Sequence, residues 1–439
     1  MVKKYPCVKK VSKTKDKRIV LEKSKLMGKS VQVTPVTKIR NPEQLLLECM
    51  PAFGAAYVRR IYSILDLAIG RGVPLIISVS GPLTASNAHR AWFIPLLETG
   101  WVAYITTTDA VCYHDGHDML QAFTERPLYE VPIEGFDEKL REQGVIRITD
   151  IGFSEDLLYQ QDKFITAMFR QPEFQRKMTG TEFRWQMGKY YAAQEKAFKI
   201  KPGLLSTCWR HDIPVFVGAP GDGSNFLNSV KLWALSQLGK ISHAFEIDVH
   251  KEVMESCAYH YWGLKCSQAK QLAILILGGG VPKNFSLQPE PTLSQIFGLP
   301  NIRGYDYDVQ IVGAPVTDGS LTSCKGQEAH TWGKVSKEAL QSTVESYQSD
   351  YTTHMPLIAW ALVHKRQRYL KMHKKMGDKL YELHPDAQGY IRPQGQLRLF
   401  KQREELMANL LKAISEPVSL KRLQKTMDFP LQLFKQKSR

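Results

Sequence analysis

A lysine that closely follows a tryptophan is the side chain of this sequence best suited to covalent chemistry. Lys334 follows Trp332 and one glycine, and Glu328 lies six residues before it. An indole beside a lysine in a partly dry cleft disfavours the ammonium form and exposes the neutral amine that Schiff-base chemistry needs. Glu328 could accept a proton or hold a cationic substrate. Without such a cleft, the same lysine is an ordinary surface residue.

Two glycine-rich segments are candidates for binding a nucleotide. In Gly278-Gly-Gly-Val-Pro-Lys-Asn284, three successive glycines bare their backbone N–H groups to a phosphate or a planar ring. The spacing is not GxGxxG, and the residues after the glycines predict no helix, so the usual dinucleotide fingerprint is absent. In Gly221-Asp222-Gly-Ser224, Asp222 could accept hydrogen bonds from a ribose. A structural glycine turn and a capped strand-to-helix turn stay open as alternatives.

The segment His114-Asp-Gly-His-Asp118 holds four side chains that can bind a divalent metal. Four ligands within five residues cannot converge on one ion without help, and no distant His/Cys cluster supplies that help. We therefore expect a hydrogen-bonded turn and no metal. A serine hydrolase is also disfavoured, because no GxSxG segment occurs.

Five compact apolar runs predict the strands that must position these residues. They cover residues 74–80, 101–108, 213–220, 271–279 and 307–315. Apolar runs without strict alternation indicate strands buried on both faces, and the helical segments between them indicate a doubly wound, mostly parallel α/β sheet with helices on both faces. Ligands of such sheets bind beyond the carboxyl ends of the strands, where both glycine-rich segments fall.

Helical periodicity fills most of the remaining sequence. Residues 41–70 predict a helix that is capped by Asn41 and kinked or divided at Pro51. Residues 135–210 predict amphipathic helices whose spaced apolar side chains belong to the core. After Val363, basic residues mix with Leu and Phe at helix-like intervals, which indicates a basic helical C-terminal extension.

Composition and charge exclude several classes of protein. The 439 residues are 43% hydrophobic, which is ordinary globular composition and rules out disorder throughout. No long apolar run and no secretion signal appear, so we expect a cytoplasmic protein without a membrane span. Seven cysteines without a CxxC pair indicate reduced thiols.

The net charge of +16 lies at the two ends of the chain. Residues 1–30 hold eleven Lys or Arg against two Asp or Glu, and residues 364–439 hold eighteen against seven. Residues 31–363 hold thirty against thirty-four. The centre is therefore mildly acidic, and nucleic-acid binding by the core is not expected.

Taken together, the GDGS segment at 221–224, the GGGVPKN segment at 278–284 and the DGS…E…TWGK segment at 318–334 resemble the deoxyhypusine synthase family in their order and separations. The resemblance runs from about residue 74 to residue 363. It implies a Rossmann-like NAD-binding sheet and a homotetramer with active sites between paired subunits. It also implies that an enzyme lysine carries an aminobutyl group, taken from spermidine, as an imine before an acceptor amine receives it.

The resemblance assigns roles to individual residues. Lys334 stands at the position of the imine-forming lysine, and Trp332 and Glu328 match its neighbours. The implied NAD contacts are Ser80, Thr84, Thr107, Thr108, Asp222, Gly279, Gly280, Ala314, Asp318 and Asp350.

Departures from the family pattern fall on the polyamine side. Leu321 stands where the family has an aspartate. A second aspartate of the family is also missing, at the position of Leu227 and the adjacent Asn228. Asn284 replaces a histidine. Ammonium groups in a dry pocket need anionic partners, each charged hydrogen bond contributing about 1.5–3 kcal/mol, so we expect an altered amine donor or acceptor.

The sequence therefore predicts three parts: a basic segment at 1–40, an NAD-binding catalytic domain at 41–363 and a basic helical extension at 364–439. The expected function is NAD-dependent transfer of an aminobutyl or related group from a polyamine, spermidine or putrescine, to an amine acceptor, which the family makes a protein lysine. Homospermidine-type polyamine synthesis is an equal variant. A catalytically altered NAD- or polyamine-binding regulatory protein is the rival, and a plain NAD dehydrogenase ranks third.

Overall fold

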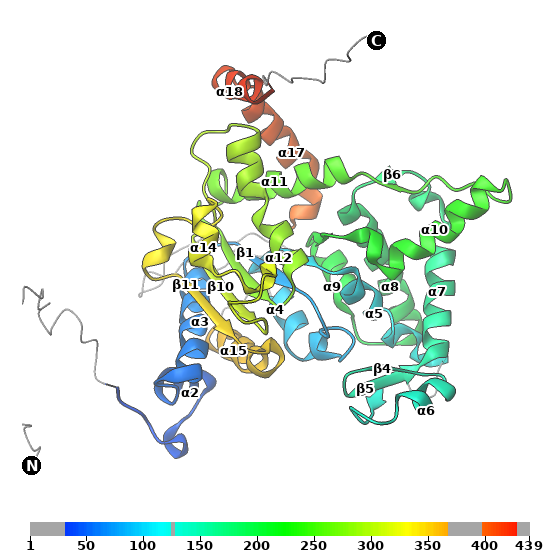
Figure 1. The fold of residues 1–439 in the computed structure, drawn as a ribbon, viewed down its shortest axis with the longest axis horizontal. Helices are drawn as coiled ribbons and strands as arrows, with labels where there is room; N and C mark the ends of the chain where they lie inside the picture. The colour runs from blue at the N-terminus through cyan, green and yellow to red at the C-terminus, as the bar shows by residue number, and fades with distance from the viewer. Residues whose placement is uncertain (1–30, 124–127, 368–396, 428–439) are drawn as a thin grey trace, which may run out of the picture.

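A six-stranded parallel sheet forms the centre of the protein. The computed structural model describes residues 31–123, 128–367 and 397–427 (Figure 1). The strands of the central sheet are β1 (Leu75–Val79), β2 (Val102–Thr107), β7 (Val215–Val217), β9 (Ala273–Leu277), β10 (Tyr307–Val312) and β11 (Val344–Gln348). Each of the five predicted runs contains one of them. The edge strand β11 was not predicted, because its VESYQ sequence is polar and only half-buried.

The strand order creates a reversal point in the sheet. In space the strands run β11-β10-β9-β1-β2-β7, and all neighbouring pairs are parallel. After β1, the chain adds β2 and then β7 on one side of it. The chain then places β9 on the other side of β1 and adds β10 and β11 beyond it. The pairing from Leu75 opposite Ala273 to Val79 opposite Leu277 joins the two halves. Ligands of open α/β sheets bind in the crevice at such a point.

Helices cover both faces of the sheet. Within the described ranges, the α-helices of four or more residues are α2 (Pro42–Glu48), α3 (Phe53–Gly70), α4 (Ile94–Leu97), α5 (Asp109–His114), α6 (Asp137–Glu142), α7 (Glu155–Phe169), α8 (Gly180–Phe198), α9 (Leu204–His211), α10 (Ser224–Gln237), α11 (Val249–Lys265), α12 (Gly280–Leu287), α14 (Gly326–Thr331), α15 (Tyr351–Lys365), α17 (Leu399–Ser415) and α18 (Pro417–Met427). The predicted doubly wound α/β class is confirmed.

Alternate side chains of β1 enter two separate hydrophobic cores. Leu75, Ile77 and Val79 pack with α3 and α15, whereas Ile76 packs with α11 and α17 on the opposite face. This alternation follows from the period of two of a β-strand. Both faces of the strand are buried, as its uninterrupted apolar sequence predicts.

The predicted N-terminal helix is divided as expected. Asn41 Oδ1 accepts a hydrogen bond from the Gln44 amide at 2.9 Å and caps α2. The helical conformation is interrupted around Pro51, between the end of α2 and the start of α3. Residues 1–30 of the predicted basic segment lie outside the described residues.

The all-helical prediction for 135–210 is wrong in part. A small antiparallel sheet of β3 (Tyr129–Glu130), β5 (Ile151–Ser154) and β4 (Val145–Ile148) precedes α7. A further short pair joins β6 (Lys177–Met178) to β8 (Glu246–Ile247). These strands are two to four residues long, which is too short to set a period in the sequence.

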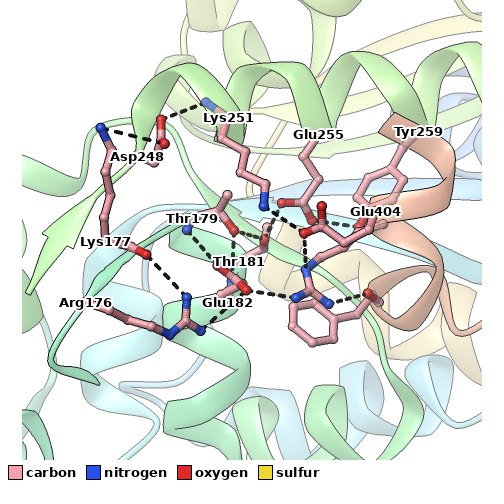
Figure 2. Close-up of polar contacts among 12 residues, drawn as sticks. Arg176, Lys177, Thr179, Thr181, Glu182, Asp248, Lys251, Glu255, Tyr259 and Glu404 are labelled. Atoms are coloured by element: carbon pink, nitrogen blue, oxygen red, sulfur yellow. Dashed lines mark hydrogen bonds and ion pairs between the residues drawn. The ribbon is translucent and has the colours of Figure 1, made fainter. Parts of the chain in front are cut away.

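Helix α17 of the C-terminal extension packs on the body of the protein beside α11 (Figure 1). Its residues Leu399, Leu406 and Leu410 are buried in the core on that side. Charged groups surround this contact: Arg403 donates to Glu182 of α8 at 2.8 Å, and Lys251 of α11 donates to Glu404 at 2.8 Å (Figure 2). The described part of the extension is helical as predicted, whereas the three-part division stays a prediction.

No helix among the described residues is long and apolar enough to span a membrane. The six cysteines within those residues are free thiols.

A buried carboxyl beneath α17 should make stability depend on pH. Glu255 of α11 accepts hydrogen bonds from Thr181 Oγ1 at 2.6 Å and from the Tyr259 hydroxyl at 2.7 Å (Figure 2). Burial raises the pKa of Glu255 from 4.5 to about 7. Between these two values the folded protein holds a proton that the unfolded chain releases, so stability falls as pH rises. The loss reaches up to about 3 kcal/mol.

Glu255→Gln should remove this loss, because the amide stays neutral at every pH. Urea unfolding at pH 5 and pH 8 measures it. We expect the difference in unfolding free energy between the two pH values to shrink in Glu255→Gln and to stay as in the wild type in Glu405→Gln, whose side chain is exposed on α17. Equal pH dependence in Glu255→Gln and the wild type would contradict the assignment.

Candidate functional site

The glycine triplet lies at the reversal point of the sheet. Gly278 and Gly279 follow β9 with φ values of +65° and +58°, a region that favours glycine, and α12 begins at Gly280. The expectation that no helix follows was wrong. It failed because Pro282 and the lack of an Asp, Ser or Thr cap hide the start, although proline is tolerated in a first helical turn. Backbone N–H groups of the triplet therefore sit at a helix N-terminus, where they favour anions.

Ser80, at the carboxyl end of β1, closes the other side of this point. A side chain on Gly279 would collide with Ser80 Oγ, so the Ser80 side chain lies directly against the Gly279 backbone. The Tyr351 hydroxyl donates to the Ser80 carbonyl at 2.8 Å. Ser80 and Gly279 are thus brought together from different strands, as parallel strand ends require.

Two of the threonines turn their hydroxyls to the backbone. Thr84 Oγ1 donates to the Val111 carbonyl at 2.8 Å, and Thr107 Oγ1 donates to the Val79 carbonyl at 2.7 Å. Both side chains are buried. They tie the ends of β1 and β2 together, and their hydroxyl protons are committed to that role.

Lys334 lies beside the helix that the triplet begins. Its Nζ donates to Asn284 Oδ1 of α12 at 3.5 Å and lies 5.9 Å from the ring centre of Trp332. The side chain is half-buried, and this burial lowers the pKa of Lys334, opposed by the thiol of Cys324 and the carboxyl of Glu290. The sequence predicts an indole beside this amine, partial burial and a lowered pKa.

Trp332 and Glu328 are more open than Lys334. The Trp332 side chain is 69% exposed, and Glu328 is exposed on α14. Leu321, one of the altered positions, packs near Gly280 and is also exposed. Lys334 and Leu321 therefore both lie next to α12, which carries Asn284.

A buried lysine that the sequence did not assign anchors the loop before α14. Lys283 is 1% exposed, and its Nζ donates to Gln310 Oε1 at 2.8 Å and to the carbonyls of Thr322 and Cys324. Asp308 lies buried on the same strand as Gln310, and the charge of Lys283 partly offsets the burial that raises its pKa to about 6. The polar residues inside the otherwise apolar run YDVQIV were the available signal.

A cavity of about 880 Å³ opens at the carboxyl ends of β1, β2 and β7. Thr108, Asp222, Leu227 and Asn228 line it, so the structure brings four of the predicted residues together. Asp222 and Leu227 are exposed. Two carboxylates that the sequence did not assign, Asp109 and Asp162, line the same cavity.

Asn228 belongs to a hydrogen-bonded set in this wall. Its Nδ2 donates to Asp162 Oδ1 at 2.6 Å, and its Oδ1 accepts from Lys231 Nζ at 3.0 Å. The Tyr113 hydroxyl donates to Asp162 Oδ1 at 3.0 Å. The cavity wall thus holds a carboxyl group and the amine of Lys231 beside the apolar Leu227.

The remaining predicted cofactor residues lie at other loops. Ala314, after β10, lines a second cavity of about 240 Å³ with Gln310. Asp318 accepts hydrogen bonds from the amide and hydroxyl of Ser320 at 3.0 and 3.1 Å. Asp350 caps α15 by accepting from the Thr352 amide at 2.8 Å. Both aspartates are exposed.

The histidine-rich segment forms a structural turn in the described chain. Buried Asp115 accepts from the amides of Leu204 and Leu205 at 2.6 and 2.8 Å, which satisfies the N-terminus of α9. His114 Nδ1 lies 3.3 Å from His117 Nε2. Burial lowers the pKa of His114 to about 4 and that of His117 to about 3, so both rings are neutral at pH 7.

Comparison with known proteins identifies the family. The family model described as deoxyhypusine synthase matches residues 46–362. The chain belongs to the deoxyhypusine synthase family. A deoxyhypusine synthase-like protein of Nostoc punctiforme is 32% identical over 348 residues, which cover 78% of this chain and 85% of the relative. A relative named "Probable deoxyhypusine synthase 2", from Methanosarcina acetivorans, is 28% identical over 301 residues, which cover 69% and 79%.

The residues at the sheet reversal fit the NAD that the deoxyhypusine synthase family implies. The triplet contributes no side chains of its own at the N-terminus of α12, which suits a pyrophosphate. Asp222 lines the open cavity and has an acceptor carboxylate for ribose hydroxyls.

Proposed function

We propose that this protein is an NAD-dependent transferase that moves an aminobutyl or related alkyl-amine group from a polyamine to an amine acceptor through an imine on Lys334. One observation carries the proposal: the half-buried Lys334 amine meets Asn284, four residues after the glycine that begins α12. Burial disfavours the ammonium form of Lys334, and the neutral amine is the nucleophile. The family supports the transferase class.

Lys334, Trp332 and the bound cofactor have separate roles in the proposed reaction. Bound NAD would supply a hydride acceptor for the carbon beside the donor nitrogen, and later return that hydride. The Lys334 nitrogen attacks the carbon–nitrogen double bond of the oxidised donor, and the donor's remaining amine leaves. An acceptor amine then attacks the Lys334 imine and frees the lysine. Trp332 lies beside the amine, with its ring centre 5.9 Å from Nζ.

The altered pocket favours a changed amine pair. Leu227 in the cavity wall and Leu321, which lies near α12 outside that cavity, offer no charge to an ammonium group, whereas Asp162 adds a carboxylate to the cavity wall beside Asn228. A donor held at one end by a carboxylate and along its methylenes by apolar side chains fits this lining. Spermidine and putrescine both have this form, and either a diamine or a protein lysine suits as acceptor.

A second copy of the chain would complete this cavity. Helix α10 exposes a row of apolar side chains, among them Leu227, Val230 and Trp233, which are 53%, 41% and 57% exposed. Leu238, directly after the helix, is 70% exposed. Such a row is typical of a protein interface. Because Leu227 also lines the cavity, a copy packed on α10 would cover its rim, as a site between paired subunits requires. The proposed assembly is the homotetramer that the family implies, and the proposed location is the cytoplasm.

Incubation with NAD and a panel of polyamines tests the function. The purified protein should form enzyme-bound NADH with at least one donor, and an added acceptor amine should receive the isotope-labelled alkyl-amine group with no net NADH. NADH formation from alcohols alone would instead indicate a dehydrogenase. Binding of NAD or polyamine with no amine oxidation would contradict transfer and favour a regulatory binding protein.

A further inference from the structure

A buried carboxylate faces the backbone next to Lys334. Glu290 lies in the helical turn Pro289–Pro291 after α12, and its side chain is 5% exposed. Its Oε2 has no hydrogen-bond partner among the described residues. Leaving a buried carboxylate oxygen without a donor costs free energy, so such groups in native proteins need an explanation.

The surroundings of Glu290 show which part of the protein this oxygen faces. Gly333 has a φ of +79°, and a Cβ built on it would lie 2.7 Å from Glu290 Oε2. Glycine is therefore needed at 333 both for its backbone and for the space that the carboxylate occupies. The unpartnered oxygen thus lies against the residue that directly precedes Lys334.

The electrostatics of the two side chains are complementary. Burial raises the pKa of Glu290 and lowers that of Lys334, while the charge of each favours the charged form of the other. Two other titratable groups act on Lys334: the Cys324 thiol and the ammonium of Lys283. Burial thus brings the pKa of the carboxyl and the pKa of the amine closer together, which favours proton exchange between them.

We propose that Glu290 is the proton partner of Lys334, a positioning role that rests on the imine chemistry proposed above. No hydrogen bond or ion pair joins Lys334 Nζ to Glu290 Oε2 among the described residues, so a water or a substrate amine relays the proton. In this exchange an N–H bond of the Lys334 ammonium breaks, its electron pair stays on nitrogen, and an O–H bond forms at Glu290 Oε2. No oxidant or reductant takes part. Glu328, which the sequence placed in this role, is exposed to solvent.

Trace labelling with acetic anhydride tests this without relying on turnover. The reagent acylates only neutral amines, so the pH dependence of Lys334 labelling, read by mass spectrometry on the full chain, gives its apparent pKa. Glu290→Gln should lower that pKa by about one unit, because an adjacent carboxylate stabilises the ammonium. Glu290→Asp should retain most of the wild-type value. Glu338→Gln, an exposed carboxyl four residues after Lys334, should leave it unchanged.

Thermal unfolding of each variant identifies those that fold. If Glu290→Gln does not fold, the labelling curve of Glu290→Asp is compared with that of the wild type instead. Coincident labelling curves for wild type and a folded Glu290→Gln would overturn the proposal, as would an equal shift in Glu338→Gln. In an active protein, Glu290→Gln should slow transfer about 100-fold with partial recovery in Glu290→Asp. A shifted curve in a protein without any transfer would refute the proposed function and support the proton partnership.

Discussion

Lys334→Ala should lower transfer of the alkyl-amine group by about a thousandfold or more, because removing a covalent nucleophile leaves only binding and positioning. The variant should still fold. The Lys334 side chain is half-buried, and the hydrogen bond of its Nζ to Asn284 is long, at 3.5 Å. Its loss should change unfolding free energy by no more than about 1 kcal/mol.

The matched control is Lys337→Ala, which removes an exposed lysine three residues away. It should keep wild-type transfer. NAD binding, measured by calorimetry, should be retained in both variants, since the glycine triplet and Asp222 are unchanged. Transfer by Lys334→Ala within about tenfold of the wild type would show that the amine is not the carrier.

Arg184→Ala should destabilise the fold by about 3–5 kcal/mol, the usual cost of breaking a buried ion pair. Arg184 of α8 is 1% exposed, and it donates to Glu252 Oε1 of α11 and to the Val215 carbonyl of β7, both at 2.6 Å. Its removal leaves the carboxylate of Glu252 buried without its cation. Because burial already raises the pKa of Glu252, the variant should lose further stability as pH rises.

Two further variants separate the buried charge from lost packing. Arg184→Ala combined with Glu252→Gln should recover part of the loss, because no uncompensated charge remains. Arg141→Ala breaks an exposed pair with Glu155 and should cost at most about 1 kcal/mol. Urea unfolding measures all of these variants. An Arg184→Ala loss no larger than that of Arg141→Ala would refute the structural role of the buried pair.

Sequence patterns predicted the elements whose physical signal is strong and local. The run LIISV is buried on both faces, so its apolar residues had no reason to alternate, and a central strand followed. The Asn41 cap and the break at Pro51 were predictable for the same reason, because each depends on a single residue's own chemistry. The placement of the glycine triplet and of Asp222 beyond strand ends followed from the fold class.

Contacts between segments far apart in the sequence could not be predicted. Glu290 lies between two prolines with no pattern to mark it, and only the approach of Gly333 shows what it faces. Lys283 follows the glycine triplet in a stretch where no helix was predicted, and no pattern showed that the loop carrying Thr322 and Cys324 folds over it. The start of α12 was hidden because a glycine rather than a polar side chain occupies its N-cap position.

Borohydride trapping tests the role of Lys334 most directly. The full-length protein is incubated with NAD and each donor of the polyamine panel, reduced, digested and sequenced by mass spectrometry. An imine on Lys334 predicts one stable alkyl-amine adduct on the peptide that contains Trp332 and Lys334, dependent on both NAD and donor. A trapped adduct on another lysine, or NADH formation from a donor with no adduct on any residue, would contradict it.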